Sequence, residues 1–153
     1  WIDFPREGNG WSHKYARRQW NLVDNKELDY HYLGDFDHDM LSVLKSEKNI
    51  NKTAVQEIWH NDGDQILAYM RGDLVFVFNF SPSRSYSDYG FLVPEGAYEV
   101  MLNTDSKLYG GNGLADDTIT HFTNSDKLYA KDHKGWLMLY IPARSAVVLR
   151  RKE

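Results

Sequence analysis

The run Leu74-Val75-Phe76-Val77-Phe78-Asn79-Phe80 decides the fold of this chain. Six of its seven residues are apolar or aromatic, and an unbroken apolar run of this length predicts a strand that is covered on both faces. Arg71-Gly72-Asp73 precedes the run and is interpreted as a tight turn between strands rather than as an adhesion tripeptide, because glycine accepts turn dihedrals. Residues 66–70 are therefore its predicted partner strand.

The rest of the chain after residue 50 repeats this alternation of short apolar segments and turn signals, which predicts an antiparallel β-sandwich. Asn61-Asp62-Gly63-Asp64 is a hairpin signal because Asn, Asp and Gly accept positive φ. Residues 81–90 are rich in Ser and Tyr and are predicted to form a polar loop. The remaining strands are predicted at residues 55–60, 97–102, 119–123, 136–141 and 146–149.

The pattern before residue 50 is helical instead. Three short helices are predicted, at residues 12–23 with Ser12 as the N-cap, at residues 25–33 ended by Gly34, and at residues 37–45. Each of these helices has a weak apolar stripe. They therefore need another surface to pack against.

Composition narrows the range of partners. The 153 residues carry a formal net charge of −4, with acids and bases mixed along the chain, and we expect neither nucleic acid nor a membrane as a partner. The chain has no cysteine, which excludes disulfides and thiolate metal sites. No apolar run is long enough to span a bilayer, and the first residues lack the pattern of a signal peptide.

The opening residues Trp1-Ile2-Asp3-Phe4-Pro5-Arg6 crowd aromatic and charged side chains into a loop, and Gly8-Asn9 follows. Aromatic faces beside charged groups suit contact with a sugar or another ligand, and functional residues gather on loops. More motifs follow in order along the chain: Tyr15-Ala16-Arg17-Arg18-Gln19-Trp20, Tyr32-Leu33, Phe36-Asp37, Phe76 to Ser81 with Pro82-Ser83-Arg84-Ser85-Tyr86, Tyr109-Gly110-Gly111, and Tyr140-Ile141-Pro142-Ala143-Arg144.

Taken together, these motifs resemble the C-terminal part of glycogen (1,4-α-glucan) branching enzymes, which are members of the α-amylase superfamily. The resemblance implies a fragment of a longer cytoplasmic enzyme that transfers an α-1,4-glucan segment to a 6-hydroxyl and so makes α-1,6 branches in glycogen. Residues 1–46 would be the last loop and helices of a (β/α)8 catalytic barrel, and residues 47–153 the C-terminal all-β sandwich. No cofactor is implied.

The resemblance also implies where the chemistry lies. A retaining double displacement needs a pair of carboxyl groups that flank the scissile bond, and in this family the catalytic carboxylates precede the segment matched here. We therefore expect no catalytic residue in this chain, which alone would be inactive. Its expected roles are to brace the barrel and to contact the α-glucan.

Trp1, Asp3 and Arg6 are the candidate substrate-binding residues, because loops at the C-terminal ends of barrel strands build the active site in this architecture. An aspartate accepts two hydrogen bonds from vicinal sugar hydroxyls, and Trp1 offers a flat apolar face. The alternative is a structural Asp–Arg pair that clamps the loop, and both interpretations stay open.

Other motifs receive structural interpretations. Asp35, Asp37 and Asp39 imitate the start of a calcium loop, but the later positions do not fit, and no metal site is predicted. Gly110-Gly111-Asn112-Gly113 is interpreted as turn geometry. Trp59 and Trp136 are predicted to be core or interface residues.

The Ser81-to-Tyr89 loop, with its arginine and tyrosines, is interpreted as a contact with the barrel rather than with glucan. Three alternatives remain for the function of the chain. They are an autonomous carbohydrate-binding module, a purely structural domain, and the C-terminal domain of a hydrolytic amylase relative.

Overall fold

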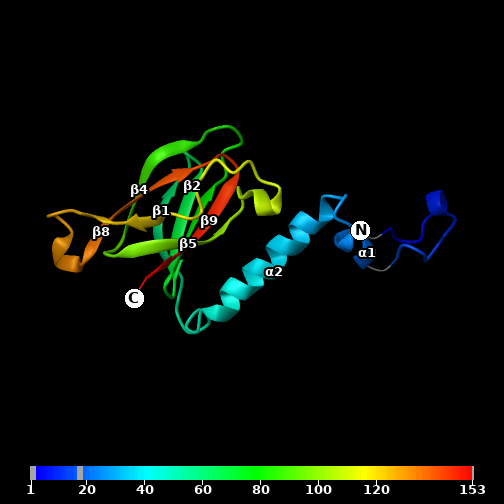
Figure 1. The fold of residues 1–153 in the computed structure, drawn as a ribbon, viewed down its shortest axis with the longest axis horizontal. Coiled ribbons are helices and arrows are strands. Elements are labelled where there is room, and N and C mark those ends of the chain that lie inside the picture. The colour runs from blue at the N-terminus through cyan, green and yellow to red at the C-terminus, as the bar shows by residue number, and fades with distance from the viewer. Residues whose placement is uncertain (1–2, 17–18, 153) are drawn as a thin grey trace.

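Two antiparallel β-sheets packed face to face form the body of the molecule (Figure 1). The computed structural model describes residues 3–16 and 19–152. The larger sheet has the strand order β1-β2-β3-β9-β5-β6, and the smaller has the order β4-β8-β7. The strands are β1 (Gln56–Asn61), β2 (Ile66–Arg71), β3 (Leu74–Asn79), β4 (Tyr86–Pro94), β5 (Ala97–Asn103), β6 (Thr120–Phe122), β7 (Asn124–Ser125), β8 (Lys134–Ile141) and β9 (Ser145–Arg151).

The core lies between the two sheets. Alternate residues of each strand point inward, as the period of two requires: Val75 and Val77 from β3 meet Leu137 from β8, and all three are fully buried. The mainly β fold and the antiparallel sandwich predicted from the sequence are confirmed. The core residues are Ile66, Ala68, Val75, Val77, Phe91, Val93, Tyr98, Leu137, Leu139, Ile141 and Leu149.

Two strand predictions were wrong in part. The outer face of β3 is not fully covered, since Phe76 and Phe78 are only half-buried and Phe80, just beyond the strand, is 60% exposed. Residues 86–90 are not a loop but the first half of β4. Their polar composition suits this position because β4 is the edge strand of the smaller sheet, where polar side chains and bulges are common.

The helices also differ from the prediction. Helix α1 covers only Trp20–Asp24, and one continuous helix α2 (Tyr30–Ser46) replaces the two predicted after it. Gly34 lies inside α2 rather than ending it. A Cβ atom at Gly34 would lie 2.7 Å from Cγ1 of Val23, so this glycine allows α1 to pack closely on α2.

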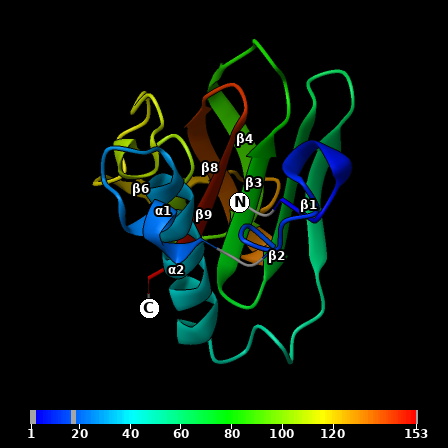
Figure 2. The same cartoon turned by 90° about the vertical axis from the view of Figure 1, so that its right-hand side faces the viewer.

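Helix α2 packs on the outer face of the larger sheet. Its inward residues Phe36, Met40, Val43 and Leu44 join a second cluster that is built on the buried side chains of Ile50, Leu74, Leu102 and Val148. Figures 1 and 2 show α2 over the half of the sheet that contains β5 and β9; the opening loop, drawn in front of β1 and β2 in Figure 2, lies far from them in Figure 1. Among the residues that the structure describes, none before Ile50 is buried.

Candidate functional site

The opening loop brings together two of the three predicted substrate-binding residues. Arg6 donates from Nε to Oδ1 of Asp3 at 2.9 Å and from Nη2 to Oδ2 at 3.3 Å. Asn9 donates to the same Oδ2 at 3.0 Å and to the carbonyl of Phe4 at 3.0 Å. The 3₁₀ turn Glu7–Asn9 follows Arg6 directly. Asp3 and Arg6 thus form a forked ion pair that closes the loop.

This geometry has an electrostatic consequence. The hydrogen bond from Arg6, followed by that from Asn9, lowers the pKa of the Asp3 carboxyl, so Asp3 is ionised near neutral pH. Its oxygens already accept three hydrogen bonds from within the loop. The arrangement is that of a loop clamp with a partly exposed carboxylate, and contact with substrate stays a prediction. Trp1, the third predicted residue, lies outside the described residues.

A second group of polar and aromatic residues, which we call the edge cluster, joins the β1–β2 turn to the start of β4. Its members are Trp59, Asp64, Arg84, Tyr86 and Tyr89. The indole Nε1 of Trp59 donates to the Tyr89 hydroxyl at 3.1 Å, and that hydroxyl donates to Oδ2 of Asp64 at 3.0 Å. The Tyr86 hydroxyl donates to the backbone carbonyl of Asp64 at 3.0 Å. Arg84 donates to the carbonyl of Gly63 at 2.5 Å and lies over the Tyr86 ring.

Trp59 and Trp136 were predicted to be core or interface residues. Trp59 is 46% exposed, so the core is wrong for it and the interface stays a prediction. Trp136 is half-buried and donates its indole N–H to Asp126. A β-bulge between Glu57 and Trp59 and another between Tyr86 and Tyr89 re-aim these side chains. A bulge depends on pairing with a partner strand and leaves no clear signal in one sequence.

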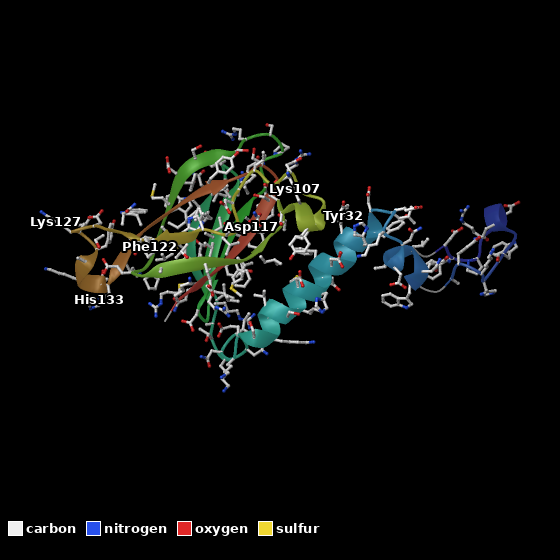
Figure 3. All side chains as sticks on the ribbon, viewed as in Figure 1. Tyr32, Lys107, Asp117, Phe122, Lys127 and His133 are labelled. Atoms are coloured by element: carbon white, nitrogen blue, oxygen red, sulfur yellow. The ribbon has the colours of Figure 1, made fainter. Side chains whose placement is uncertain are left out.

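A groove of about 800 Å³ runs between α2 and the loop after β5. The ring of Phe36 meets that of Tyr109 edge to face, and the Tyr109 hydroxyl donates to Asp39 at 2.8 Å. Burial and then this hydrogen bond raise the pKa of Tyr109 to about 12. Tyr32 and Lys107 lie on opposite sides of the groove (Figure 3). The groove therefore marks the junction of the helical segment with the sandwich.

The glycine-rich segment 110–113 begins with the predicted turn at Gly110 and continues as an irregular loop. Gly110 and Gly113 have φ of 75° and 65°, which favours glycine. Asp105 is buried and organises this loop, because its carboxylate accepts backbone N–H bonds from Asn112, Leu114 and Ala115. The loop is thus held from inside by a carboxylate.

The outer face of β2 and β3 carries a row of rings that we call the aromatic file: Tyr69, Phe76, Phe78 and Phe80. Neighbouring rings are stacked, with centroids 4.8 Å apart for Tyr69 and Phe76 and 5.7 Å apart for Phe78 and Phe80. Their ring faces contact one another and are therefore occupied. Such a surface suits a packing partner better than a sugar ring.

The described residues offer neither a metal-binding cluster nor a membrane-spanning helix. No group of three His, Asp or Glu side chains there is placed to hold a metal ion. In the same part of the chain, no helix has both the length and the apolar character needed to cross a membrane.

Comparison with known proteins identifies the class to which this sandwich belongs. Residues 58–152 match the family model described as "Alpha amylase, C-terminal all-beta domain". The match covers most of the chain and all of its strands but the start of β1. The chain therefore belongs to this family, in agreement with the resemblance found in the sequence.

Several curated relatives carry one particular name. The chain is 40% identical over its whole length to the 1,4-alpha-glucan-branching enzyme of Saccharomyces cerevisiae and 38% identical over 97% of its length to that of Rhizophagus irregularis. It is 43% identical over 82% of its length to a chloroplastic/amyloplastic 1,4-alpha-glucan-branching enzyme of Oryza sativa subsp. japonica. The chain spans only 22%, 22% and 16% of the lengths of these relatives.

A solved structure agrees with the fold. The cyclomaltodextrin glucanotransferase CldA aligns with 98% of this chain, and the alignment covers 27% of that protein with a TM-score of 0.52. At 12% identity, this likeness concerns the fold alone.

Proposed function

We propose that this chain is the C-terminal part of a 1,4-α-glucan branching enzyme. The observation that carries the proposal is the similarity of 82–100% of the chain to enzymes of that name, at 36–43% identity. The enzyme would cleave an α-1,4 bond and pass the glucan segment to a 6-hydroxyl, forming an α-1,6 branch in glycogen. It would act in the cytoplasm, although the rice relative is named as a plastid enzyme.

The chemistry would be a retaining double displacement through a covalent glycosyl-enzyme intermediate. The carboxylates for this reaction would come from the part of the longer enzyme outside this chain. Residues 1–46 would belong to the catalytic barrel and residues 47–153 to the sandwich. Trp1, Asp3 and Arg6 would contact glucan from the barrel side, and the chain alone would be inactive.

The proposed role of the sandwich is to brace the barrel, and two surfaces support this. The aromatic file leaves all four of its rings at least partly open on the outer face, beside the area that α2 covers. The helical segment buries none of its described residues. Both features suit a molecule whose α2 side packs on a further domain, because a large apolar surface is rarely left bare.

The activity is tested on the longer enzyme. Incubation with amylose should lower the absorbance of the glucan–iodine complex without releasing reducing sugar, and debranching should then yield short chains. The 153-residue chain should do neither. Release of free malto-oligosaccharides without new branches would show that the enzyme hydrolyses glucan instead of transferring it. The proposed activity would then be wrong, and the hydrolytic amylase alternative would take its place.

The bracing role has its own test. Replacing Phe78 with Ser should lower the melting temperature of the longer enzyme by several degrees and that of the 153-residue chain by less, because the ring would be buried only when the barrel is present. Phe122→Ser, at an exposed ring on β6, is the matched control. Equal effects of Phe78→Ser in both proteins would contradict the role.

A further inference from the structure

We propose that the edge cluster is a second α-glucan-binding site, with the indole of Trp59 as its platform. This inference rests on the proposed function for the identity of the sugar. The site would bind a linear malto-oligosaccharide segment away from the opening loop.

The orientation of Trp59 separates the edge cluster from the bracing surface. Trp59 pairs with Ala68, which is fully buried in the core between the sheets. Paired residues of antiparallel strands point to the same side, so Trp59 lies on the side of the smaller sheet. Tyr69, the next residue of β2, points to the opposite face with the aromatic file. A barrel packed on the aromatic file would therefore leave Trp59 accessible.

The surroundings of Trp59 hold its ring in place before any ligand arrives. Its N–H is bonded to Tyr89, whose hydroxyl is in turn bonded to Asp64. Arg84 and Tyr86 tie the same β1–β2 turn to β4. No other ring of the described residues stacks on the indole. A fixed and half-exposed aromatic face loses little entropy on binding, and Asp64 and Arg84 add charged hydrogen-bonding groups to the same cluster.

The strand edges at this site suit hydroxyl groups better than another strand. β1 is the outer strand of the larger sheet, β4 is the outer strand of the smaller one, and the two strands lie in contact. Their outer N–H and C=O groups are free of sheet partners. Each strand carries a bulge at the cluster, which breaks the regular repeat that an added strand requires. Sugar hydroxyls need no such repeat and can satisfy these groups.

The test measures binding of maltoheptaose to the 153-residue chain by titration calorimetry and its retardation by glycogen in a native gel. The unchanged chain should bind both, and Trp59→Ala should weaken binding by about tenfold or more, because tryptophan side chains are frequent hot spots of binding. Trp59→Tyr, which keeps an aromatic face, should recover most of the affinity. Tyr89→Phe, which frees the indole without removing it, should weaken binding by a few-fold.

Matched controls keep the result interpretable. Phe122→Ala removes a ring that is 69% exposed at the far end of the sandwich (Figure 3) and should leave binding unchanged. Cellohexaose should not bind. The proposal is overturned if the folded chain does not bind maltoheptaose, if Trp59→Ala binds as well as the unchanged chain, or if Trp59→Tyr fails to recover binding while its melting temperature is normal.

These outcomes are independent of the proposed enzyme activity. Branching by the longer enzyme with no maltoheptaose binding to this chain would remove the second site alone. Binding of cellohexaose equal to that of maltoheptaose would overturn the assignment to α-glucan. Binding of an extended peptide instead of either sugar would make the edge a strand-addition surface and would also overturn the proposal.

Discussion

The two halves of this molecule reach order in different ways. Between the sheets of the sandwich lie eleven buried core residues, while none of the described residues before Ile50 is buried. The helical half is held by one face of α2 on the larger sheet and by surface hydrogen bonds such as those of Asp3. The difference indicates that the sandwich stabilises itself, whereas the helical half depends on its neighbours.

The largest expected effect lies in the sandwich core. Leu137→Ala should lower the free energy of unfolding by about 3 kcal/mol, because it leaves a cavity at a fully buried position. Leu41→Ala, on the exposed side of α2, should cost less than about 0.5 kcal/mol. Urea unfolding followed by circular dichroism measures both. Similar losses of unfolding free energy in the two variants would contradict the view that the sandwich is stabilised by its core and the helical half by its neighbours.

Asn79 provides the next test, because it is a polar residue inside the sandwich. Its amide donates to the carbonyls of Arg84, Ile141 and Pro142, and its oxygen accepts from the N–H of Ser81. Asn79→Ala should cost about 2 kcal/mol, since it leaves buried backbone groups unpaired. Asn21→Ala, at an exposed position of α1, should be close to neutral in the same unfolding experiment.

A substitution at the junction between the two halves should lower the free energy of unfolding by less than the two core substitutions. Tyr109→Phe removes the hydrogen bond to Asp39 and should cost about 1 kcal/mol. Hydrogen exchange should show this loss mainly as faster exchange in α2. If the core strands exchanged faster to the same extent, the two halves would not be separable units.

Tyr109 also gives the junction a dependence on pH. Its pKa is raised from 10.0 to about 12 in the folded chain, so the stability that its protonated hydroxyl contributes is fully present below pH 10. This stability is lost as the pH rises through 12. Tyr98 in the core has a pKa raised to about 12 by burial. The free energy of unfolding should therefore fall as the pH rises from 9 to 12. This fall should be smaller in Tyr109→Phe and also smaller in Tyr98→Phe, because each variant removes one of the two tyrosine hydroxyls with a raised pKa.

The smallest effect on stability should come from the opening loop. Asp3→Asn breaks an exposed ion pair with Arg6 and should change the melting temperature of the chain by about a degree or two at most, because solvent screens an exposed ion pair. In the longer enzyme, the same variant should lower kcat/KM for amylose if Asp3 contacts glucan. Unchanged kinetics would leave the loop clamp as its only role.

The candidate sites show where sequence reasoning succeeds. The Asp3–Arg6 loop was found because its residues are neighbours in the chain, and the turns at Gly72 and Gly110 were found because glycine marks positive φ. The sequence singled out the 81–89 part of the edge cluster, but not its union with Trp59 and Asp64. This cluster unites the β1–β2 turn with β4, and the exposure of Trp59 depends on two bulges that no local pattern indicates.

The sequence by itself determined the change from helix to strand near residue 50 and the antiparallel sandwich, because hydrophobic period and turn residues act over short distances along the chain. The family came from the resemblance of motifs along the chain to those of known enzymes. Only the tertiary structure decided that Gly34 lies within a helix, since the close contact with Val23 supplies the reason. It also decided that polar residues 86–90 form an edge strand and that Trp59 reaches the surface. These features arise from contacts between distant segments, where packing overrides local preference.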